Sequence, residues 1–154
     1  MNYYSLFFGL LLIVAPVTQK QFVSFDDESV SISRQDEIVA IVIPFEIIEG
    51  YHIQAVSEAK DNLIATEFSL VYNEAYTILS EEFTSTNYDT VILNQFTHRV
   101  LSNRLEMTVT LKLNVDVIDS ELKLKGQLMY QACDDKQCYF PRTLNFVAKL
   151  RFDK

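Results

Sequence analysis

The sequence predicts an all-β fold, an immunoglobulin-like antiparallel β-sandwich. Apolar and polar residues alternate with a period of two along most of the chain, as expected for strands with one buried face. No window has the i, i+3, i+4, i+7 apolar spacing of an amphipathic helix. Turn-forming residues separate about seven to nine short candidate strands, a number that is typical of a one-domain sandwich. The chain has 154 residues, 49% of them hydrophobic, which is enough for one core.

The strongest strand signal covers residues 105–117, where every second residue is apolar and the residues between are polar. Residues 122–131 and 143–152 repeat this pattern. Gly126 interrupts the first of these two rows, which predicts either a bulge or a close approach of a neighbouring group.

A less regular strand signal covers residues 38–48, which are rich in β-branched side chains. Pro44 has no backbone N–H group and therefore predicts an edge strand or a bulge within this segment. Shorter candidate strands lie at residues 29–33, 68–72 and 90–93. Turns are predicted at residues 49–50, 60–62, 87–89, 102–103 and 119–120.

The first residues of the chain differ in kind from the rest. Residues 6–15 form an unbroken apolar run that ends at Pro16, and Lys20 follows. This outline is typical of a secretory signal peptide, which we place at residues 1–20. The run is shorter than the roughly 20 apolar residues that a spanning helix needs. We therefore expect an exported, periplasmic protein with a cleaved leader and one domain at residues 21–154, with tethering by an uncleaved leader as the alternative.

The composition excludes several classes of function. The chain carries 21 acidic and 13 basic residues, a net charge of −8, without a basic cluster, so we expect no binding to nucleic acid or anionic membranes. Three glycines hardly suffice for a phosphate-binding loop. His52 and His98 are too far apart in sequence for the histidine pair of a zinc site. We expect no metal and no cofactor, and we expect His98 to be a surface or loop residue rather than a base.

Cys133 and Cys138 flank a short loop between the strands predicted at 122–131 and 143–152. Residues at the ends of such a hairpin loop can approach closely enough for a disulfide. A ring this small contributes roughly 2 kcal/mol, which is modest for a domain of this size. It is also easily reached by another thiolate. Spacing alone leaves a redox-active pair and an inert structural disulfide about equally favoured.

The segment around the cysteines is the most specific part of the sequence. It reads GQLMYQACDDKQCYFP over residues 126–141, and it resembles the cysteine-bearing segment of the N-terminal periplasmic domain of DsbD, a membrane thiol:disulfide interchange reductase. Residues 45–53, which end in Gly50-Tyr51-His52-Ile53, are similar to another strand of that family. The resemblance implies an immunoglobulin-like fold. It also implies a Cys133–Cys138 disulfide that accepts electrons from a thioredoxin-like domain and passes them to periplasmic disulfide proteins.

The same resemblance implies a cap loop that carries an aromatic residue and covers the cysteines. We place this cap at Gln95, Phe96 and Thr97, with Tyr88 as the alternative aromatic residue. The acidic residues that precede the aromatic residue in the family are absent here, which argues against a carboxylate-assisted step. Beside the cysteines, Tyr130 and Phe140 are candidates for a docking surface, although an aromatic residue in a strand is more often part of the core.

Two further expectations concern partners and chemistry. The membrane carrier and thioredoxin-like domain of full reductases do not follow Lys154, so we expect either an electron donor that acts in trans or the loss of the full relay. We also expect a monomer. Asp134 and Asp135 disfavour a thiolate on Cys133, so the pair is expected to receive attack rather than to attack. The alternative is a non-enzymatic, exported binding module with an inert disulfide, whose reduction potential is expected below about −300 mV.

Overall fold

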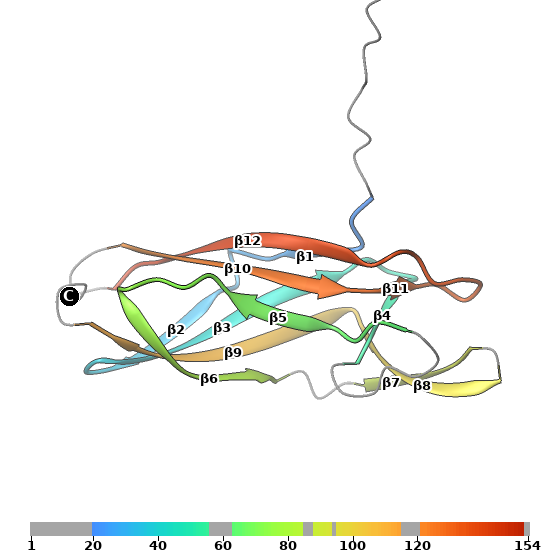
Figure 1. The fold of residues 1–154 in the computed structure, drawn as a ribbon, viewed down its shortest axis with the longest axis horizontal. Helices are drawn as coiled ribbons and strands as arrows, with labels where there is room; N and C mark the ends of the chain where they lie inside the picture. The colour runs from blue at the N-terminus through green and yellow to red at the C-terminus, as the bar shows by residue number, and fades with distance from the viewer. Residues whose placement is uncertain (1–19, 56–62, 85–87, 94, 115–120, 153–154) are drawn as a thin grey trace, which may run out of the picture.

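The computed structural model describes residues 20–55, 63–84, 88–93, 95–114 and 121–152, and it confirms an all-β, immunoglobulin-like antiparallel sandwich (Figure 1). Most of the predicted leader lies outside the described residues. Within the described ranges, no helix is long and apolar enough to span a membrane. The strands are β1 (Val23–Phe25), β2 (Ser31–Gln35), β3 (Ile38–Ile47), β4 (His52–Gln54), β5 (Glu67–Leu70), β6 (Tyr76–Phe83), β7 (Tyr88–Leu93), β8 (Phe96–Ser102), β9 (Arg104–Leu113), β10 (Leu122–Tyr130), β11 (Ala132–Cys133) and β12 (Arg142–Leu150).

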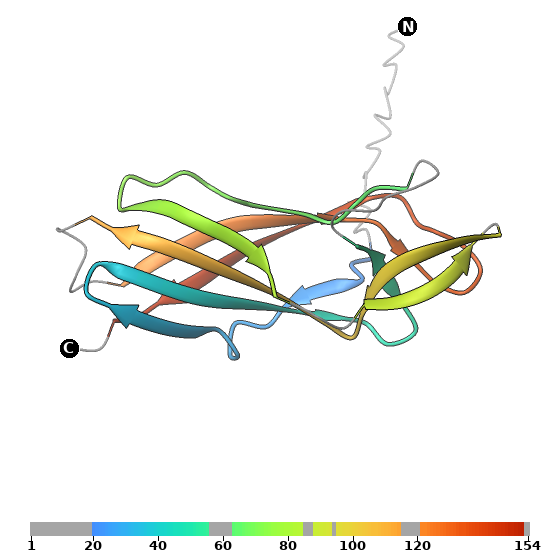
Figure 2. The same cartoon turned by 90° about the horizontal axis from the view of Figure 1, so that it is seen from below.

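The strands form three antiparallel sheets. One sheet has the order β1-β3-β9-β6, with β2 pairing a second part of β3, and another has the order β12-β10-β5. These two sheets form the body of the sandwich. The third, with the order β11-β4-β8-β7, lies at one end of the molecule, where the cysteine hairpin also projects (Figures 1 and 2). We call it the end sheet, and the sequence patterns did not predict it as a separate sheet.

The core of the body is built by the alternating strands that the sequence predicts. Along β9, the buried residues are every second one from Leu105 to Leu113, and β10 alternates in the same way from Leu122 to Tyr130. Phe45 of one sheet meets Phe146 of the other at a ring-centroid distance of 5.4 Å. The period-two pattern therefore becomes the single face that each strand buries. The remainder of the predicted strand, residues 115–117, lies outside the described residues.

Pro44 is neither on an edge strand nor at a bulge, which corrects the sequence prediction. β3 pairs continuously with β9 through Pro44 and Glu106. On the other side of β3, β1 ends at the pair Phe25–Phe45 and β2 begins at the pair Ser31–Val42. The carbonyl of Pro44 points to this side, where it accepts a hydrogen bond from Asp26 N at 3.1 Å. Because the N and C=O of a strand residue face the same way, the missing N–H falls in the gap between two short strands.

Gly126 is a site of close approach, and the pairing of β10 continues through it without a bulge. A Cβ atom at this position would lie 2.5 Å from Phe146 Cζ and 2.8 Å from the carbonyl oxygen of Ser69. Of the two alternatives that the sequence left open, close approach is therefore correct. Glycine lets the β12 aromatic ring lie flat against the centre of β10.

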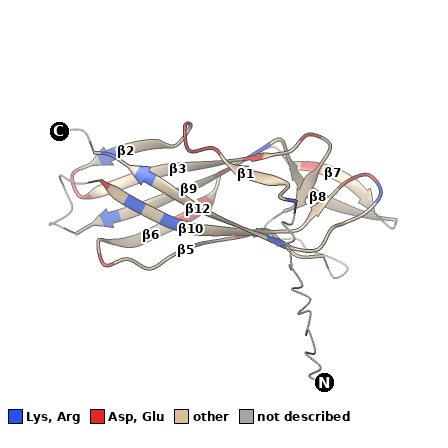
Figure 3. Ribbon diagram, turned by 90° about the horizontal axis from the view of Figure 1, so that it is seen from above, with Lys and Arg blue, Asp and Glu red and all other residues tan. Residues whose placement is uncertain are grey.

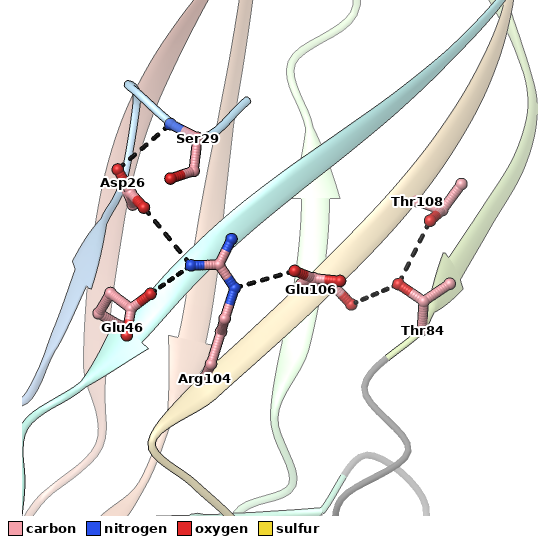
Figure 4. A network of polar contacts seen from close by, with 7 residues as sticks. All are labelled: Asp26, Ser29, Glu46, Thr84, Arg104, Glu106 and Thr108. Atoms are coloured by element: carbon pink, nitrogen blue, oxygen red, sulfur yellow. Dashed lines mark hydrogen bonds and ion pairs between the residues drawn. The ribbon is translucent and has the colours of Figure 1, made fainter. Parts of the chain in front are cut away.

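The junction between the body and the end sheet is tied by Arg104, at the start of β9 (Figure 4). Its guanidinium lies 2.5 Å from Glu46 Oε1, 2.9 Å from Glu106 Oε1 and 3.5 Å from Asp26 Oδ2. The preceding turn has Asn103 at a φ of 64°, and Asn103 O accepts a hydrogen bond from Ile47 N. These ion pairs are partly exposed, so each contributes modestly, but together they fix where β8 turns into β9.

Several elements differ from the predictions. β4, β6 and β8 have no clear alternating pattern in the sequence and were not predicted, and Tyr88 and Asp89 lie in β7 rather than in a turn. The turns at Gly50, which has a φ of 81°, and at Asn103 are confirmed. The turns predicted at residues 60–62 and 119–120 lie outside the described residues.

Candidate redox site

Cys133 and Cys138 form a disulfide at the end of the sandwich, as the sequence predicts. The two residues face each other as an isolated antiparallel bridge, and their Cα atoms are 3.9 Å apart. Cys133 ends β11, in the chain segment that continues from β10, and the loop then returns towards β12. The hairpin between body strands thus carries the disulfide out of the body and onto the edge of the end sheet.

Asp134 builds the loop that joins the two cysteines. Its Oδ1 accepts hydrogen bonds from Lys136 N at 2.8 Å and Gln137 N at 2.9 Å, and its Oδ2 accepts one from the hydroxyl of Tyr139 at 2.7 Å. The hydrogen bond from Tyr139, followed by the two from the backbone, lowers the pKa of the Asp134 carboxyl. An aspartate that binds backbone N–H groups two and three residues ahead stabilises a tight turn. The loop is therefore held in shape while the disulfide is intact.

The return limb of the hairpin is anchored by Tyr139. Its N–H group donates to Ala132 O at 2.8 Å, and its carbonyl accepts from Gln131 Nε2 at 3.0 Å. Its ring packs on Phe22 at a centroid distance of 4.6 Å and near Tyr51 at 5.9 Å. The Gly50-Tyr51 segment noted in the sequence thus lies against the cysteine hairpin, far from it in sequence but close in space.

The two sulfurs of the disulfide are in different environments. Cys133 is completely buried, at 0% exposure, whereas Cys138 is partly exposed. An incoming thiolate can therefore approach Cys138, and Cys133 is the sulfur that would leave. The spacing of the cysteines could not predict this asymmetry.

The buried sulfur has two polar neighbours on β4. Cys133 pairs directly with His52, so their side chains lie on the same face of the end sheet. Gln54 Nε2 lies 3.5 Å from Cys133 Sγ as a hydrogen-bond donor. Burial lowers the pKa of His52, against the opposing effects of Asp135, Asp134 and Asp89. Sequence analysis missed Gln54, and it considered His52 only as a metal ligand.

The predicted cap residues lie at the tip of the β7–β8 hairpin rather than in a loop. Gln95 has a φ of 72°, and Phe96, which starts β8, is 54% exposed; Thr97 is exposed as well. Ser102 is the β8 residue opposite His52, so Phe96 lies about six residues, or roughly 20 Å, along β8 from the row that contains Cys133. A cap formed by Phe96 therefore requires the hairpin to fold towards the disulfide.

The two candidate docking residues, Tyr130 and Phe140, differ clearly in exposure. Tyr130 is buried; its hydroxyl accepts hydrogen bonds from Phe22 N at 3.0 Å and Val23 N at 3.3 Å, and donates one to Gln21 Oε1 at 2.7 Å. It therefore has the core role, because it anchors the N-terminal strand and is closed to a partner. Phe140 is 84% exposed beside the disulfide and remains available for docking.

His98 and Tyr88 also have different positions from those expected. His98 is buried on β8, not on the surface, because it lies on the face of the strand that also buries Val100, whereas Thr97 and Arg99 on the other face are exposed. Tyr88 is partly buried at the start of β7, where the guanidinium of Arg99 lies 4.1 Å from the centre of its ring.

No protein-family model matches the chain, and no curated protein matches it. Solved structures do resemble it. The N-terminal periplasmic domain of ScsB from Proteus mirabilis has a TM-score of 0.53 at 12% identity, over 79% of this chain and 44% of that one. The GAE domain of yeast GGA1 has a TM-score of 0.52 at 14% identity, over 87% and 96%. The N-terminal domain of DsbD from Neisseria meningitidis has a TM-score of 0.46 at 16% identity, over 78% and 82%.

These likenesses establish the fold and nothing finer. The chain spans less than half the length of the ScsB chain that it matches. A periplasmic domain and a GAE domain share the fold about equally well with this protein. The fold therefore does not select a function, and the choice depends on the residues around the disulfide.

Proposed function

We propose that this domain exchanges thiols and disulfides in an exported compartment, relaying electrons from a thioredoxin-like donor to exported client proteins through Cys133 and Cys138. The observation that carries the proposal is the asymmetric disulfide, with one partly exposed and one buried cysteine in a preformed loop. A disulfide that only stabilises the fold needs neither property. The resemblance of residues 126–141 to the DsbD cysteine segment supports the same function.

The chemistry needs no cofactor because the sulfur atoms perform both steps. A donor thiolate attacks Cys138 Sγ; the Cys133–Cys138 bond breaks, and its electron pair goes to Cys133 Sγ. The second donor thiolate then attacks the donor sulfur of the mixed disulfide and releases Cys138. The donor dithiol is oxidised to a disulfide, and the domain gains two electrons and two protons as a pair of thiols. The reverse sequence reduces a client disulfide.

Charge around the site favours a domain that receives attack. Asp134 and Asp135 lie in the loop between the two cysteines, and Asp89 lies on the nearby strand β7 (Figure 3). Negative charges disfavour a free attacking thiolate at this end of the molecule. Phe140, exposed next to the disulfide, offers an apolar contact for an incoming protein.

Measuring the reduction potential of the Cys133–Cys138 pair tests the proposal. A relay is expected to have a potential above about −300 mV, and a purely structural disulfide one below it. In addition, a reduced thioredoxin-like protein should reduce the native disulfide, whereas the Cys133→Ser, Cys138→Ser double variant should accept no electrons. A potential below that limit, together with no exchange, would support the non-enzymatic binding module instead.

Export is tested separately by the intact mass of the protein recovered from a periplasmic fraction. The mass should lack roughly the first 17–21 residues, as expected for signal-peptide removal. Recovery of the full-length chain from the cytoplasm contradicts the exported setting, and full-length protein in the membrane fraction indicates tethering by the leader.

A further inference from the structure

Gln54 lies beside the buried sulfur that must leave when the disulfide is attacked. Its side-chain nitrogen is 3.5 Å from Cys133 Sγ, and the residue is buried. The backbone of Gln54 is held on both sides: its carbonyl accepts a hydrogen bond from Thr66 Oγ1 at 2.6 Å, and its N–H donates to Gln131 O at 3.3 Å. A disulfide sulfur is a weak acceptor, so this contact contributes little to the oxidised protein.

His52 is the residue of β4 that lies directly opposite Cys133. It is paired with Cys133 across β4 and β11, which sets the Cβ atoms about 4.5–5.5 Å apart. The side chain is only 6% exposed, and its Nε2 has no hydrogen-bond partner among the described residues. A buried polar nitrogen without a partner is costly, and at this position it can pair with a charge that forms next to it.

We propose that Gln54 and His52 stabilise Cys133 as the thiolate that leaves when a partner attacks Cys138, and so offset the unfavourable charges of Asp134 and Asp135. The inference rests on the proposed exchange function and identifies the residues that make Cys133 the better leaving sulfur.

The step balances as follows. The donor thiolate forms a bond with Cys138 Sγ, the Cys133–Cys138 bond breaks, and the electron pair remains on Cys133 Sγ. The Gln54 N–H group then donates to an anion instead of a neutral sulfur, and such charge-assisted hydrogen bonds are about twice as strong. His52 takes up a proton from solvent and becomes the counter-ion of the thiolate. Both groups therefore act more strongly on the transition state than on the intact disulfide.

The charged groups around His52 determine how its pKa changes when the disulfide is reduced. Asp134 and Asp135 of the cysteine loop and Asp89 of β7 raise its pKa, but burial outweighs them and lowers it in the oxidised protein. Among the strand residues that the structure describes, His98 is, besides Asp89, the other titratable side chain on this face of the end sheet. Breaking the disulfide adds one negative charge next to His52, so its pKa is expected to be higher in the reduced protein.

The direct test titrates Cys133 alone, in the Cys138→Ser protein, by the ultraviolet absorbance of the thiolate. His52→Phe and Gln54→Leu are expected to move the titration midpoint to higher pH, and His52→Phe to lower the thiolate fraction at neutral pH by about tenfold, which is one pH unit. In the full protein, both substitutions should slow reduction by dithiothreitol several-fold, because a poorer thiolate leaves more slowly.

His98→Phe is the matched control. It also replaces a buried histidine on the same face of the end sheet, but His98 lies about four residues, roughly 13 Å, along β8 from the residue opposite His52. It should leave the midpoint unchanged. Equal shifts for His52→Phe and His98→Phe, or no shift for either, would overturn the proposal.

A second variant guards against misfolding of His52→Phe. His52→Gln keeps a polar side chain of similar size without the titration, and it should shift the Cys133 midpoint in the same direction. Nuclear magnetic resonance of His52 should also show a higher pKa in the reduced protein than in the oxidised protein, and equal values contradict the proposed pairing. Neither measurement involves a partner protein. Failure of a thioredoxin-like donor to react would count against the proposed function, while unchanged titrations would count against the roles of His52 and Gln54.

Discussion

The body of the sandwich and its cysteine end are both built from antiparallel strands, but they bury different kinds of side chain. In the body, every second side chain of β9 and β10 is apolar and packed in a common core. At the other end, all four buried polar residues of the described part of the chain gather in or next to the end sheet: His52, Gln54, Thr66 and His98. Polar side chains are costly to bury. We therefore attribute most of the stability to the apolar body, and the polar surroundings of the disulfide to the end sheet.

This contrast teaches where chemistry can be placed in a small β-domain. Around β4 the end sheet is covered on both faces, because Ile53 and Leu101 join the core while His52 and Gln54 are buried on the opposite face. A disulfide at the rim of such a sheet gains buried polar neighbours without interrupting the core. Figure 3 shows acidic residues on β7 and on the cysteine loop at this end.

The largest effect on stability is expected from a substitution in the body. Leu111 is fully buried on β9, and Leu111→Ala should lower the free energy of unfolding by about 2–5 kcal/mol. Urea unfolding measures this loss. Because the substitution does not touch the end sheet, the reduction potential of the disulfide should stay unchanged in the folded variant. A shifted potential would show that the two regions are coupled.

Removing the disulfide is expected to have a smaller effect on stability but to abolish exchange. In the Cys133→Ser, Cys138→Ser protein, opening the small ring should cost roughly 2 kcal/mol or less. Circular dichroism should remain that of a β-protein, because Asp134 and Tyr139 still hold the loop. A variant that fails to fold would make the disulfide a structural element and remove the main distinction between the two regions.

Acid should destabilise the oxidised protein through His52. Its pKa is lowered by burial relative to the ordinary value of 6.5. As the pH falls below about 6.5, the unfolded chain binds a proton that the folded state resists, so the free energy of unfolding decreases until the folded pKa is passed. Unfolding measured at several pH values below neutrality should show a shallower loss for His52→Phe. Identical pH dependence in both proteins contradicts a buried, neutral His52.

The smallest effect on stability is expected at the tip of the β7–β8 hairpin. Phe96 is exposed, so Phe96→Ala should change the free energy of unfolding by about 0.5 kcal/mol or less. If the hairpin folds over the disulfide as a cap, the substitution should speed reduction by glutathione. Ile92→Ala is the control, since Ile92 is exposed on the opposite face of the same hairpin. Equal glutathione kinetics in all three proteins would place the cap elsewhere, with Tyr88 as the next residue to test.

The sequence by itself determined the long central strands of the body, though not β1 or β6, and the position of the disulfide. Residues 105–113 and 122–130 alternate so regularly that one face must be buried, and this signal is local. Cys133 and Cys138 flank a loop that residues 134–137 are suited to form, because Asp134 can bind the backbone ahead of it. Strand identity and turn chemistry depend on near neighbours, which the sequence contains.

Only the tertiary structure decided which residues surround the buried sulfur. β4 is buried at all three of its positions, so a strand covered on both faces lost the period-two pattern that would have identified it. His98 was expected at the surface or in a loop, but it lies in β8 on the face that also buries Val100, while Thr97 and Arg99 on the other face are exposed. The pairing of His52 with Cys133 depends on the register between strands about 80 residues apart in sequence, and nothing local sets that register. Pro44 lies on a paired inner strand because two short strands leave a gap beside it, which is a property of the assembled sheet.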